Sequence, residues 1–297
     1  MTAVAVHLEG LGFTGAYLAW RLYEAGVPFT WEDAEVAVTA WRASTGSVYP
    51  SGHPLDMRCY REWAQAEQPE PVRAAVAVAP YWYSSKSPPH GGPWRPRRDL
   101  GCLRLHELPS IHVNVQAYVE ATRATFSGQR GPAPLGARLV VAHGFGLRLD
   151  SVVWGWSRKV LLRYDEEAFG QRACFYCREG RYGLVYAYPV PGEGTWYAGS
   201  SMVHQAVAKE LDAASRFQRW MQSFGRLTEG HIEVEVLAGI RQGWRPKPAK
   251  GDDAWVREEA GALHVKPQGA SGVRHAPALA RAVLEALGCS REGSQAR

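Results

Sequence analysis

A glycine-rich turn near the N-terminus constrains the fold of this chain more than any other feature. Residues 3–8 have the apolar pattern of a short buried strand, and residues 16–25 have the periodicity of a helix. Between them lies Gly10-Leu11-Gly12-Phe13-Thr14-Gly15. In such a unit the first glycine permits a tight turn, the second lets the backbone approach a pyrophosphate, and the third allows close helix packing. The motif therefore predicts a dinucleotide site at the helix N-terminus, whose binding residues are Gly10, Gly12, Phe13, Thr14 and Gly15.

An acidic pair follows the next predicted strand and completes a β-α-β unit. Residues 27–31 are expected to form this strand, which is followed by Glu32 and Asp33, 20 and 21 residues after Gly12. A carboxylate at this distance can accept hydrogen bonds from ribose hydroxyls. Glu9 departs from the usual pattern, because an apolar residue normally stands at its position before the first glycine.

The composition is that of a globular protein that can bury a cofactor, with 297 residues of which 46% are hydrophobic and 21% charged. The sequence has neither a run of about 18 apolar residues nor a basic leader, so we expect a cytoplasmic protein without a membrane partner. Five cysteines are an odd number, and we expect free thiols. Cys174 and Cys177 have CxxC spacing but no second ligand pair, so they are interpreted as sheet residues, and no metal site is expected.

The rest of the chain indicates a mixed α/β fold. Helices are expected at 114–124, 209–224 and 276–287, and strands at 138–142 and 232–237. Short aromatic and β-branched runs between 152 and 201 predict an antiparallel sheet, whereas 42–52 and 84–98 are rich in loop residues.

Four ordered segments resemble the superfamily of D-amino-acid oxidase, glycine oxidase and sarcosine oxidase. They are Arg42 to Pro50, Val140 to Gly144, Gly239-Ile240-Arg241 and Gly269-Ala270-Ser271-Gly272. The resemblance implies a Rossmann-like FAD-binding domain formed by residues 1–83, 110–158 and 237–290, in the glutathione-reductase-like arrangement. It also implies an antiparallel-sheet substrate domain at 159–236, besides a basic, proline-rich loop at 84–109 and a tail at 291–297.

The same resemblance implies FAD as the cofactor, and none of the five cysteines lies in an evident attachment motif, so noncovalent FAD is expected. Asp33 stands where the acidic residue of FAD-binding relatives falls and is preferred over Glu32. The segment after the second strand would wrap the FAD phosphates and reach the flavin ring. The further FAD-binding residues implied are Arg42, Ala43, Ser44, Ser47, Val48, Tyr49, Gly144, Gly269, Ala270, Ser271 and Gly272.

Oxidation of an amine beside a carboxylate requires a cation that binds the carboxylate and a substrate Cα–H that faces the flavin. Arg241 matches the arginine with this role in the amino-acid oxidases, and Arg245 is the alternative. Lys266 would lie near the flavin and favour electron transfer to oxygen. Tyr188 and Tyr197 are expected in the wall over the substrate.

The net charge of +5 and the pI near 9.0 are compatible with a polyanionic partner. Arg95, Arg97 and Arg98 follow Trp94 in the proline-rich loop and are candidates for nucleic-acid binding. The chain is in this respect similar to FAD enzymes of bacteriophage thymine-hypermodification pathways, which would act in the host cytoplasm. These enzymes cleave a glycine attached through its nitrogen to the thymine methyl carbon.

On the hypothesis of a glycine-modified thymine, Arg241 binds the glycyl carboxylate and the flavin takes the Cα hydride. The imine then hydrolyses to glyoxylate and an aminomethyl base. The base would have to leave the DNA duplex. Two alternatives stay open. One is an oxidase of free glycine, sarcosine or D-amino acids. The other is a non-catalytic flavin- or DNA-binding module, which the unusual Glu9 before the glycine motif supports.

Overall fold

The computed structural model describes most of the chain in thirteen stretches or single positions. These are residues 5–33, 41, 44, 46–50, 53–84, 98–101, 103–142, 149–179, 183–200, 203–205, 213–248, 255–265 and 272–289. Only the backbone is described for 149–155, 178–179, 183–184, 200, 203–205, 213 and 242–248. No helix in these parts is long and apolar enough to cross a membrane.

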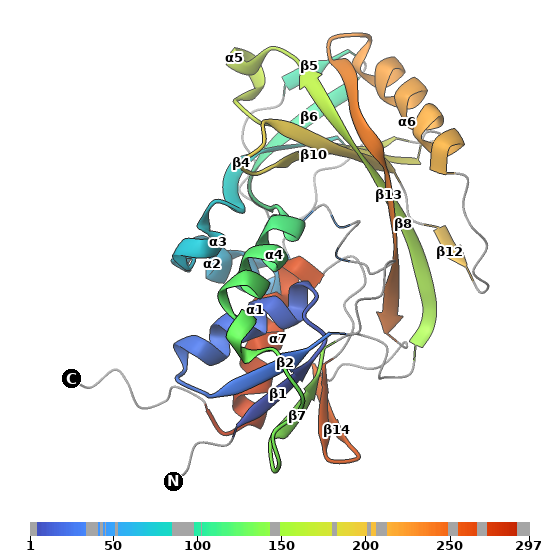
Figure 1. Cartoon of the computed structure of the whole chain (residues 1–297). Helices are drawn as coiled ribbons and strands as arrows, with labels where there is room; N and C mark the ends of the chain where they lie inside the picture. Colours follow the sequence, from blue (N-terminus) through green and yellow to red (C-terminus); the bar gives the residue numbers. More distant parts are fainter. Residues whose placement is uncertain are drawn as a thin grey trace.

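A smaller sheet contains the predicted β-α-β unit. Parallel strands β1 (Val6–Glu9), β2 (Phe29–Glu32) and β7 (Arg138–Val141) continue into the hairpin of β14 (Val256–Glu259) and β15 (Ala262–Val265), in the order β14-β15-β7-β1-β2. Helix α1 (Phe13–Glu24) connects β1 with β2 and packs against α7 (Gly272–Ala286) and α4 (Val115–Thr125). The helices and the sheet share one hydrophobic core, so this half is a compact Rossmann-like unit (Figure 1).

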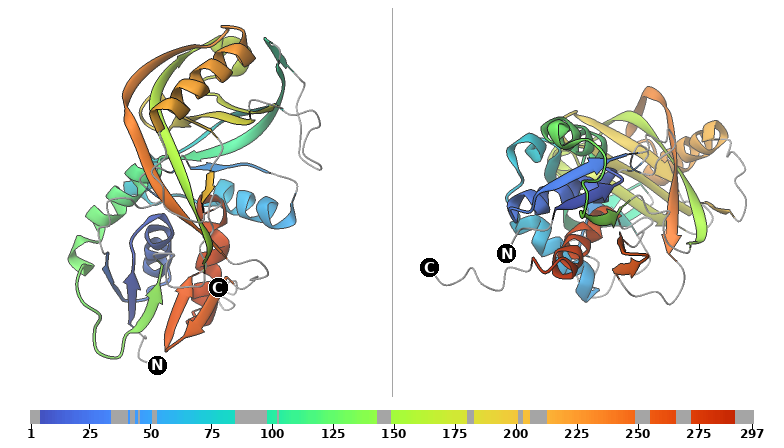
Figure 2. Two further views of the ribbon diagram at one scale, coloured as in Figure 1. Left: turned by 90° about the vertical axis from the view of Figure 1, so that its right-hand side faces the viewer. Right: turned by 60° about the horizontal axis from the view of Figure 1, so that its bottom comes forward.

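A larger sheet lies above the smaller one in Figure 1 and in the left view of Figure 2. Its order is β12-β8-β11-β10-β9-β4-β6-β3, with β13 paired to β8 and β5 to β6. Its strands are β3 (Ser47–Val48), β4 (Val76–Ser84), β5 (Arg98–Leu100), β6 (Leu103–Val113), β8 (Leu149–Arg163), β9 (Cys174–Glu179), β10 (Gly183–Val190), β11 (Thr195–Ser200), β12 (Val203–Gln205) and β13 (Glu233–Pro248). The pairs are antiparallel except for β4 with β9.

Helix α6 (Ala213–Thr228) covers one face of the larger sheet (Figure 1). Phe217, Trp220 and Phe224 lie on one side of this helix and pack in a core with Trp82 and Phe175 of the sheet. Trp220 and Phe224 are stacked with ring centroids 4.7 Å apart. The opposite face of the sheet is therefore the one available for a site.

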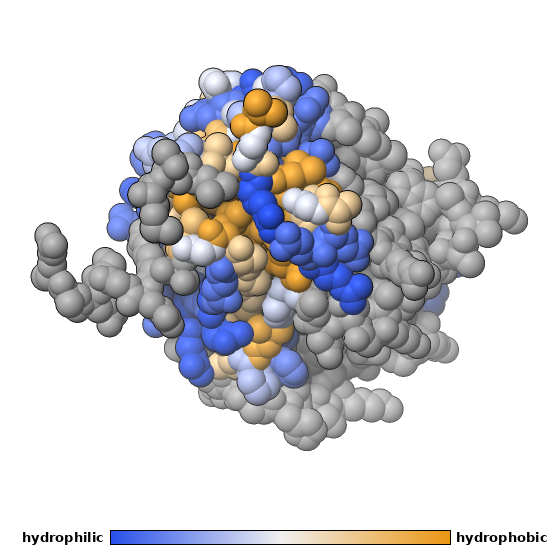
Figure 3. All heavy atoms as spheres, turned by 90° about the horizontal axis from the view of Figure 1, so that it is seen from below, coloured by the Kyte–Doolittle hydropathy of each residue, from blue (hydrophilic) through white to orange (hydrophobic). Residues whose placement is uncertain are grey.

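Shorter elements complete the fold. Helices α2 (Pro54–Gln65) and α3 (Glu70–Arg73) lie between β3 and β4 in the chain. Helix α5 (Glu166–Phe169) follows β8, and the 3-10 turn η2 (Ser127–Gln129) follows α4. Seen from below, hydrophobic and hydrophilic residues are intermixed on the described part of the surface (Figure 3).

The fold class predicted from the sequence is confirmed, with one largely parallel and one largely antiparallel sheet. The expected helices at 114–124, 209–224 and 276–287 correspond to α4, α6 and α7. The expected loop at 84–109 is wrong in its second part, because β5 and most of β6 occupy 98–109. Residues 76–83, 149–158 and 237–248, which were assigned to the FAD domain, pair within the larger sheet.

These differences have a physical cause in nonlocal pairing. Pro80 and Pro109 lie opposite each other in the β4–β6 pair, and a proline within a run argues against a strand in sequence analysis. Here both strands are stabilised by nine successive cross-strand pairs, from Val76 with Val113 to Ser84 with Leu105. β8 and β13 likewise pair over almost their whole lengths and do not divide at 158 or 237.

Candidate functional site

The glycine turn has the geometry that the motif predicts. Gly10 has a φ of 95°, and a β-carbon on Gly15 would overlap the carbonyl oxygen of Gly10. Gly12 precedes α1 without a side-chain cap, so the first N–H groups of the helix have no capping side chain. Phe13 is buried and Thr14 is partly exposed. The turn can therefore present backbone N–H groups to an anion.

Asp33 lies near this turn and forms an ion pair with Arg123 of α4. Arg123 also donates to the carbonyl oxygen of Leu11 at 3.2 Å, and its guanidinium lies 5.1 Å from the ring centre of Trp41. The Asp33 side chain is 12% exposed, whereas Glu32 is exposed at the end of β2. No local signal in the sequence marks Arg123 as a partner of Asp33, because the two residues are 90 positions apart in the chain.

The segment after β2 reaches the larger sheet. Ser47 and Val48 form β3, where Ser47 pairs with His112 and fully buried Val48 pairs with Ile111. Gly46 has a φ of 44°, and a β-carbon there would overlap the carbonyl oxygen of Val113. The predicted residues Ser44, Ser47, Val48 and Tyr49 thus lie on the path between the two sheets. Arg42 and Ala43 lie outside the described residues.

Tyr49 connects helix α7 to the larger sheet. The Arg274 guanidinium lies 4.2 Å from the Tyr49 ring centre, and Tyr49 stacks on Tyr81 at 4.6 Å. Arg274 Nη1 and His275 Nε2 each lie 2.7 Å from a carboxylate oxygen of Asp56 in α2. Gly272, a predicted FAD-binding residue, begins α7 and is therefore close in the chain to this cluster. Gly144, Lys266, Gly269, Ala270 and Ser271 lie outside the described residues.

Tyrosines line the face of the larger sheet opposite α6. Tyr188 and Tyr197 are cross-strand partners and so project from the same face, and Tyr186 and Tyr81 have ring centroids 4.6 and 6.2 Å from Tyr188. A β-carbon on Gly199 would overlap the Tyr186 ring, so the glycine lets this ring lie against the strand. Burial raises the pKa of both Tyr81 and Tyr188 well above the usual value, so both stay protonated at neutral pH.

His112 is fully buried below this tyrosine face. The Ser110 hydroxyl donates to the carbonyl oxygen of Ala79 at 2.9 Å and lies 2.7 Å from His112 Nε2. Because the Ser110 hydroxyl proton is used in the hydrogen bond to Ala79, the Nε2 atom of His112 carries a hydrogen and donates to Ser110. The Nδ1 atom of His112 is then a hydrogen-bond acceptor. Burial lowers the pKa of His112 to about 3, which keeps the ring neutral.

Two buried polar atoms near β3 have no hydrogen-bond partner in the described part of the chain. They are the Nδ1 atom of His112 and the hydroxyl oxygen of Ser47, whose residues are register partners. One is an acceptor and the other can donate. A bound heterocycle with adjacent C=O and N–H groups would satisfy both, as the pyrimidine edge of a flavin could.

Arg241 of β13 lies at the edge of the tyrosine face. Its Nη1 atom donates to the hydroxyl of Tyr197 at 2.5 Å and to the Oε1 atom of Gln116 in α4. The guanidinium lies 5.2 Å from the ring centre of Tyr197. The structure thus brings together Arg241, Tyr197 and Tyr188, three residues predicted from the sequence. Arg245 lies four residues further along β13, opposite Val153, and its side chain is outside the description.

Cys174 and Cys177 are both buried in strand β9. Residues three apart in a strand project to opposite faces, so these thiols do not converge on one metal or form one disulfide. Burial also raises the pKa of the Cys174 thiol well above its usual value. Both are sheet residues, as expected.

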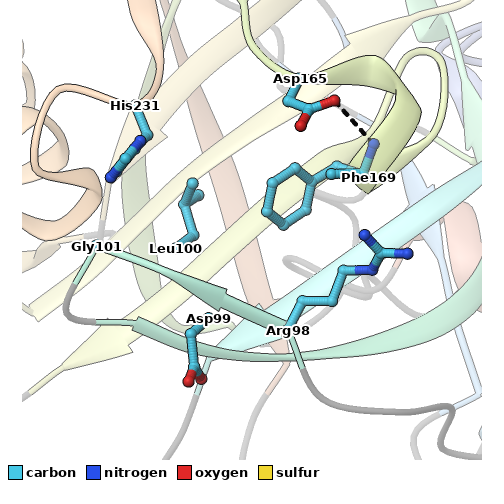
Figure 4. A pocket seen from close by; sticks show the side chains of 8 residues that line it. Arg98, Asp99, Leu100, Gly101, Asp165, Phe169 and His231 are labelled. Atoms are coloured by element: carbon cyan, nitrogen blue, oxygen red, sulfur yellow. Dashed lines mark hydrogen bonds between the residues drawn. The ribbon is translucent and has the colours of Figure 1, made fainter.

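Arg98, one of the three predicted nucleic-acid-binding residues, lies at the other end of the larger sheet. It borders a cavity of about 360 Å³ together with Asp99, Asp165, Phe169 and His231 (Figure 4). Arg98 pairs with Leu105, which is seven residues along β6 from His112, or roughly 23 Å at about 3.3 Å per residue. Arg95 and Arg97 lie outside the described residues.

Comparison with solved structures identifies the architecture. Iminodiacetate oxidase from Chelativorans sp. BNC1 is similar with a TM-score of 0.68 and 16% identity over 98% of both chains. Glycine oxidase from Geobacillus kaustophilus has a TM-score of 0.70 and 14% identity over 98% of this chain and 96% of its own. Glycerol-3-phosphate dehydrogenase from Bacillus halodurans, complexed with FAD, has a TM-score of 0.58 and 13% identity over 97% of this chain and 64% of its own.

No protein-family model matches the sequence, and no curated protein matches it. The likeness is therefore one of fold. The chain has the fold of the D-amino-acid oxidase and glycine oxidase class, in which the resemblance of the sequence placed it.

Proposed function

We propose that this protein binds FAD and oxidises the Cα–N bond of an amino-acid substrate. The observation that carries the proposal is the open edge of Arg241 beside the tyrosine face. Its Nη1 atom is used by Tyr197 and Gln116, whereas Nε and Nη2 have no partner among the described residues. The Nε–Nη2 edge of a guanidinium binds a carboxylate through two parallel hydrogen bonds. A substrate carboxylate held there would place the substrate over Tyr197 and Tyr188.

The residues present fit an FAD molecule in three places. The glycine turn and the start of α1 would hold the diphosphate. Asp33 would accept from the ribose hydroxyls, with Arg123 fixing its orientation. Ser47 and His112 offer a donor and an acceptor to a heterocycle edge. When bound, FAD would supply a two-electron acceptor for the Cα hydride.

The chain would then contribute binding, orientation and exclusion of water. Arg241 fixes the carboxylate, and the buried tyrosine rings exclude water, which favours the neutral amine. None of Tyr81, Tyr188 and His112 is suited to remove a proton, because the tyrosines stay protonated and His112 is buried with a lowered pKa. Lys266 is proposed to lie near the flavin and to favour electron transfer to oxygen.

The proposed substrate class is an N-substituted glycine. Two proteins that share the fold are named for glycine and iminodiacetate, and iminodiacetate is a glycine whose nitrogen carries a second carboxymethyl group. Oxidation would transfer the Cα hydride, which carries both electrons, to FAD, and the substrate nitrogen would release its proton. Water would then add to the imine and break the C–N bond. The products are glyoxylate and the amine.

Within this class we propose a glycine attached to the thymine methyl carbon in double-stranded DNA, in the cytoplasm of a phage-infected host. The products would be glyoxylate and an aminomethyl base. The formal charge of +5 supports a polyanionic partner. Arg98, with Arg95 and Arg97, would contact the phosphates. Because Arg98 lies roughly 23 Å along β6 from His112, the base would have to leave the duplex to reach the tyrosine face.

Anaerobic reduction of the flavin tests the proposal. The purified protein is offered sarcosine, iminodiacetate, glycine, D-alanine, DNA carrying N-glycyl-methyl-thymine and unmodified DNA, and loss of the visible flavin absorbance is recorded. Loss with the modified DNA alone, accompanied by glyoxylate, would support the DNA-borne substrate. Loss with a free amino acid would make the protein an oxidase of small substrates. A protein without flavin would overturn the proposal, and flavin that no substrate reduces would indicate a non-catalytic module.

Arginine variants test the binding site in the same assay. Arg241→Ala is expected to raise KM by about a hundredfold or more, because two charge-assisted hydrogen bonds are lost. Exposed Arg163 lies at the far end of β8, and Arg163→Ala is the matched control without an expected effect. A large effect of Arg245→Ala with none of Arg241→Ala would move the carboxylate site along β13.

A further inference from the structure

The first turn of α4 joins the cofactor-binding half of the protein to the edge of the tyrosine face. The Asn114 side chain accepts from the backbone N–H of Ala117 at 3.2 Å and so caps the helix. The same side chain donates to Glu193 in the β10–β11 turn at 3.0 Å, and Glu193 also pairs with Lys159 of β8. The start of α4 is thus held against the larger sheet.

Gln116 in this turn contacts Arg241 and is itself held by Glu120. Its Oε1 atom accepts from Arg241 Nη1, while its Nε2 atom donates to Glu120 Oε1 at 2.8 Å. The carboxylate of Glu120 accepts only hydrogen bonds, so it determines which end of the Gln116 amide faces Arg241. The result is a chain of contacts from Glu120 through Gln116 and Arg241 to Tyr197.

The neutrality of Gln116 determines the charge that Arg241 presents. Arg241 makes no ion pair with a carboxylate in the described part of the chain, and its contacts there are to an amide oxygen and a hydroxyl. An amide oxygen orients the guanidinium without cancelling its charge. A glutamate of nearly the same shape would neutralise Arg241 and compete with any anion for it.

We infer that Gln116 is a positioning residue that keeps Arg241 both oriented and available for an anionic substrate. The inference rests on the proposed role of Arg241 in binding the substrate carboxylate. It makes a helix of the cofactor-binding half responsible for substrate specificity at the sheet. It also assigns Glu120 the secondary role of orienting the Gln116 amide.

Calorimetric titration with acetate and its uncharged analogue acetamide tests the inference on the protein as purified. Gln116→Glu is expected to weaken acetate binding by about tenfold or more, because the new carboxylate occupies the guanidinium, while acetamide binding changes by less than about twofold. Gln218 is exposed on α6, on the opposite face of the larger sheet, and Gln218→Glu adds the same charge as a control without an expected effect. In turnover, Gln116→Glu should raise KM and leave kcat within about twofold.

The variants separate failure of the inference from failure of the proposed function. If Arg241→Ala loses acetate binding and Gln116→Glu does not, Arg241 binds the carboxylate and the role of Gln116 is wrong. Equal losses of acetate and acetamide in Gln116→Glu would mean a general structural effect and would also overturn the inference. If acetate binding does not depend on Arg241, the proposed clamp fails and the inference fails with it. Arg241→Lys, which keeps the charge and loses the planar fork, gives this answer should the alanine variant not fold.

Discussion

The Arg274 guanidinium lies 4.2 Å from the ring centre of Tyr49, and that ring is stacked on Tyr81 at 4.6 Å. Arg274 belongs to α7 of the smaller half, Tyr49 to the segment that crosses between the sheets, and Tyr81 to β4 of the larger sheet. Asp56 of α2 pairs with Arg274 and thereby fixes it over Tyr49. Three segments far apart in the sequence are thus held together beside the tyrosine face.

Arg274→Met is expected to lower the free energy of unfolding by about 3 kcal/mol. The side chains of Arg274 and Asp56 are 14% and 13% exposed, and the variant removes the permanently charged partner of a largely buried carboxylate that also contacts His275. Urea unfolding measures the effect. Arg163 and Glu235 form a comparable pair that is 66% and 55% exposed, so Arg163→Met should cost less than about 1 kcal/mol. Equal losses in the two variants would contradict the interpretation.

Gly15→Ala is expected to lower the free energy of unfolding by about 3 kcal/mol or more, because the added methyl group overlaps the carbonyl oxygen of Gly10. Relief of the overlap would move α1 away from the turn, so the variant should also retain less bound flavin. Gly128→Ala is the control, since a β-carbon there has no neighbour within 4 Å. The ratio of flavin to protein absorbance gives the second result. A Gly15→Ala protein with wild-type flavin content would show that the turn does not bind the diphosphate.

His112 is expected to make stability depend on pH below neutrality. Its pKa is about 3 in the folded protein and about 6.5 when unfolded, so the unfolded chain takes up a proton first as the pH falls. The stabilising effect of the neutral ring is therefore complete above pH ~6.5 and is lost by ~1.4 kcal/mol per pH unit down to pH ~3. Urea unfolding at several pH values should show a smaller slope for His112→Phe than for the wild type. The exposed residue His231 supplies the control His231→Phe, and equal slopes for all three proteins would contradict the prediction.

Local signals in the sequence were sufficient for the elements that carry the dinucleotide turn. Gly15 must be a glycine because its α-carbon lies against the carbonyl oxygen of Gly10, only five residues earlier in the chain. The glycine spacing of the motif therefore predicts this contact directly. The helix after Asn114 was equally accessible, since a capping residue and an apolar face are both local. The pairing of Tyr188 with Tyr197 follows from a short connection between two adjacent strands.

Contacts between distant segments could not be predicted from one sequence. The pair of Asp56 and Arg274 is separated by 218 residues, and no local pattern marks either side chain as its partner. Pro80 and Pro109 each argue against a strand when considered alone, and only the β4–β6 pairing explains both. The position of Arg98 at the far end of the larger sheet also depends on strand pairing, so its distance from the tyrosine face could not be predicted from the sequence.

Asp33→Asn is expected to weaken FAD binding by about tenfold, whereas Glu32→Gln should have little effect. Asp33 is 12% exposed and held by Arg123 beside the glycine turn, while Glu32 is exposed at the end of β2. A hydrogen bond from a ribose hydroxyl to a charged acceptor is stronger than one to an amide, which accounts for about one order of magnitude. Quenching of flavin fluorescence on titration of the flavin-free protein measures the dissociation constants. Arg123→Met should weaken binding as well, because Asp33 would lose the partner that orients it. A larger effect of Glu32→Gln than of Asp33→Asn would assign the ribose contact to Glu32 and leave Asp33 with a structural role.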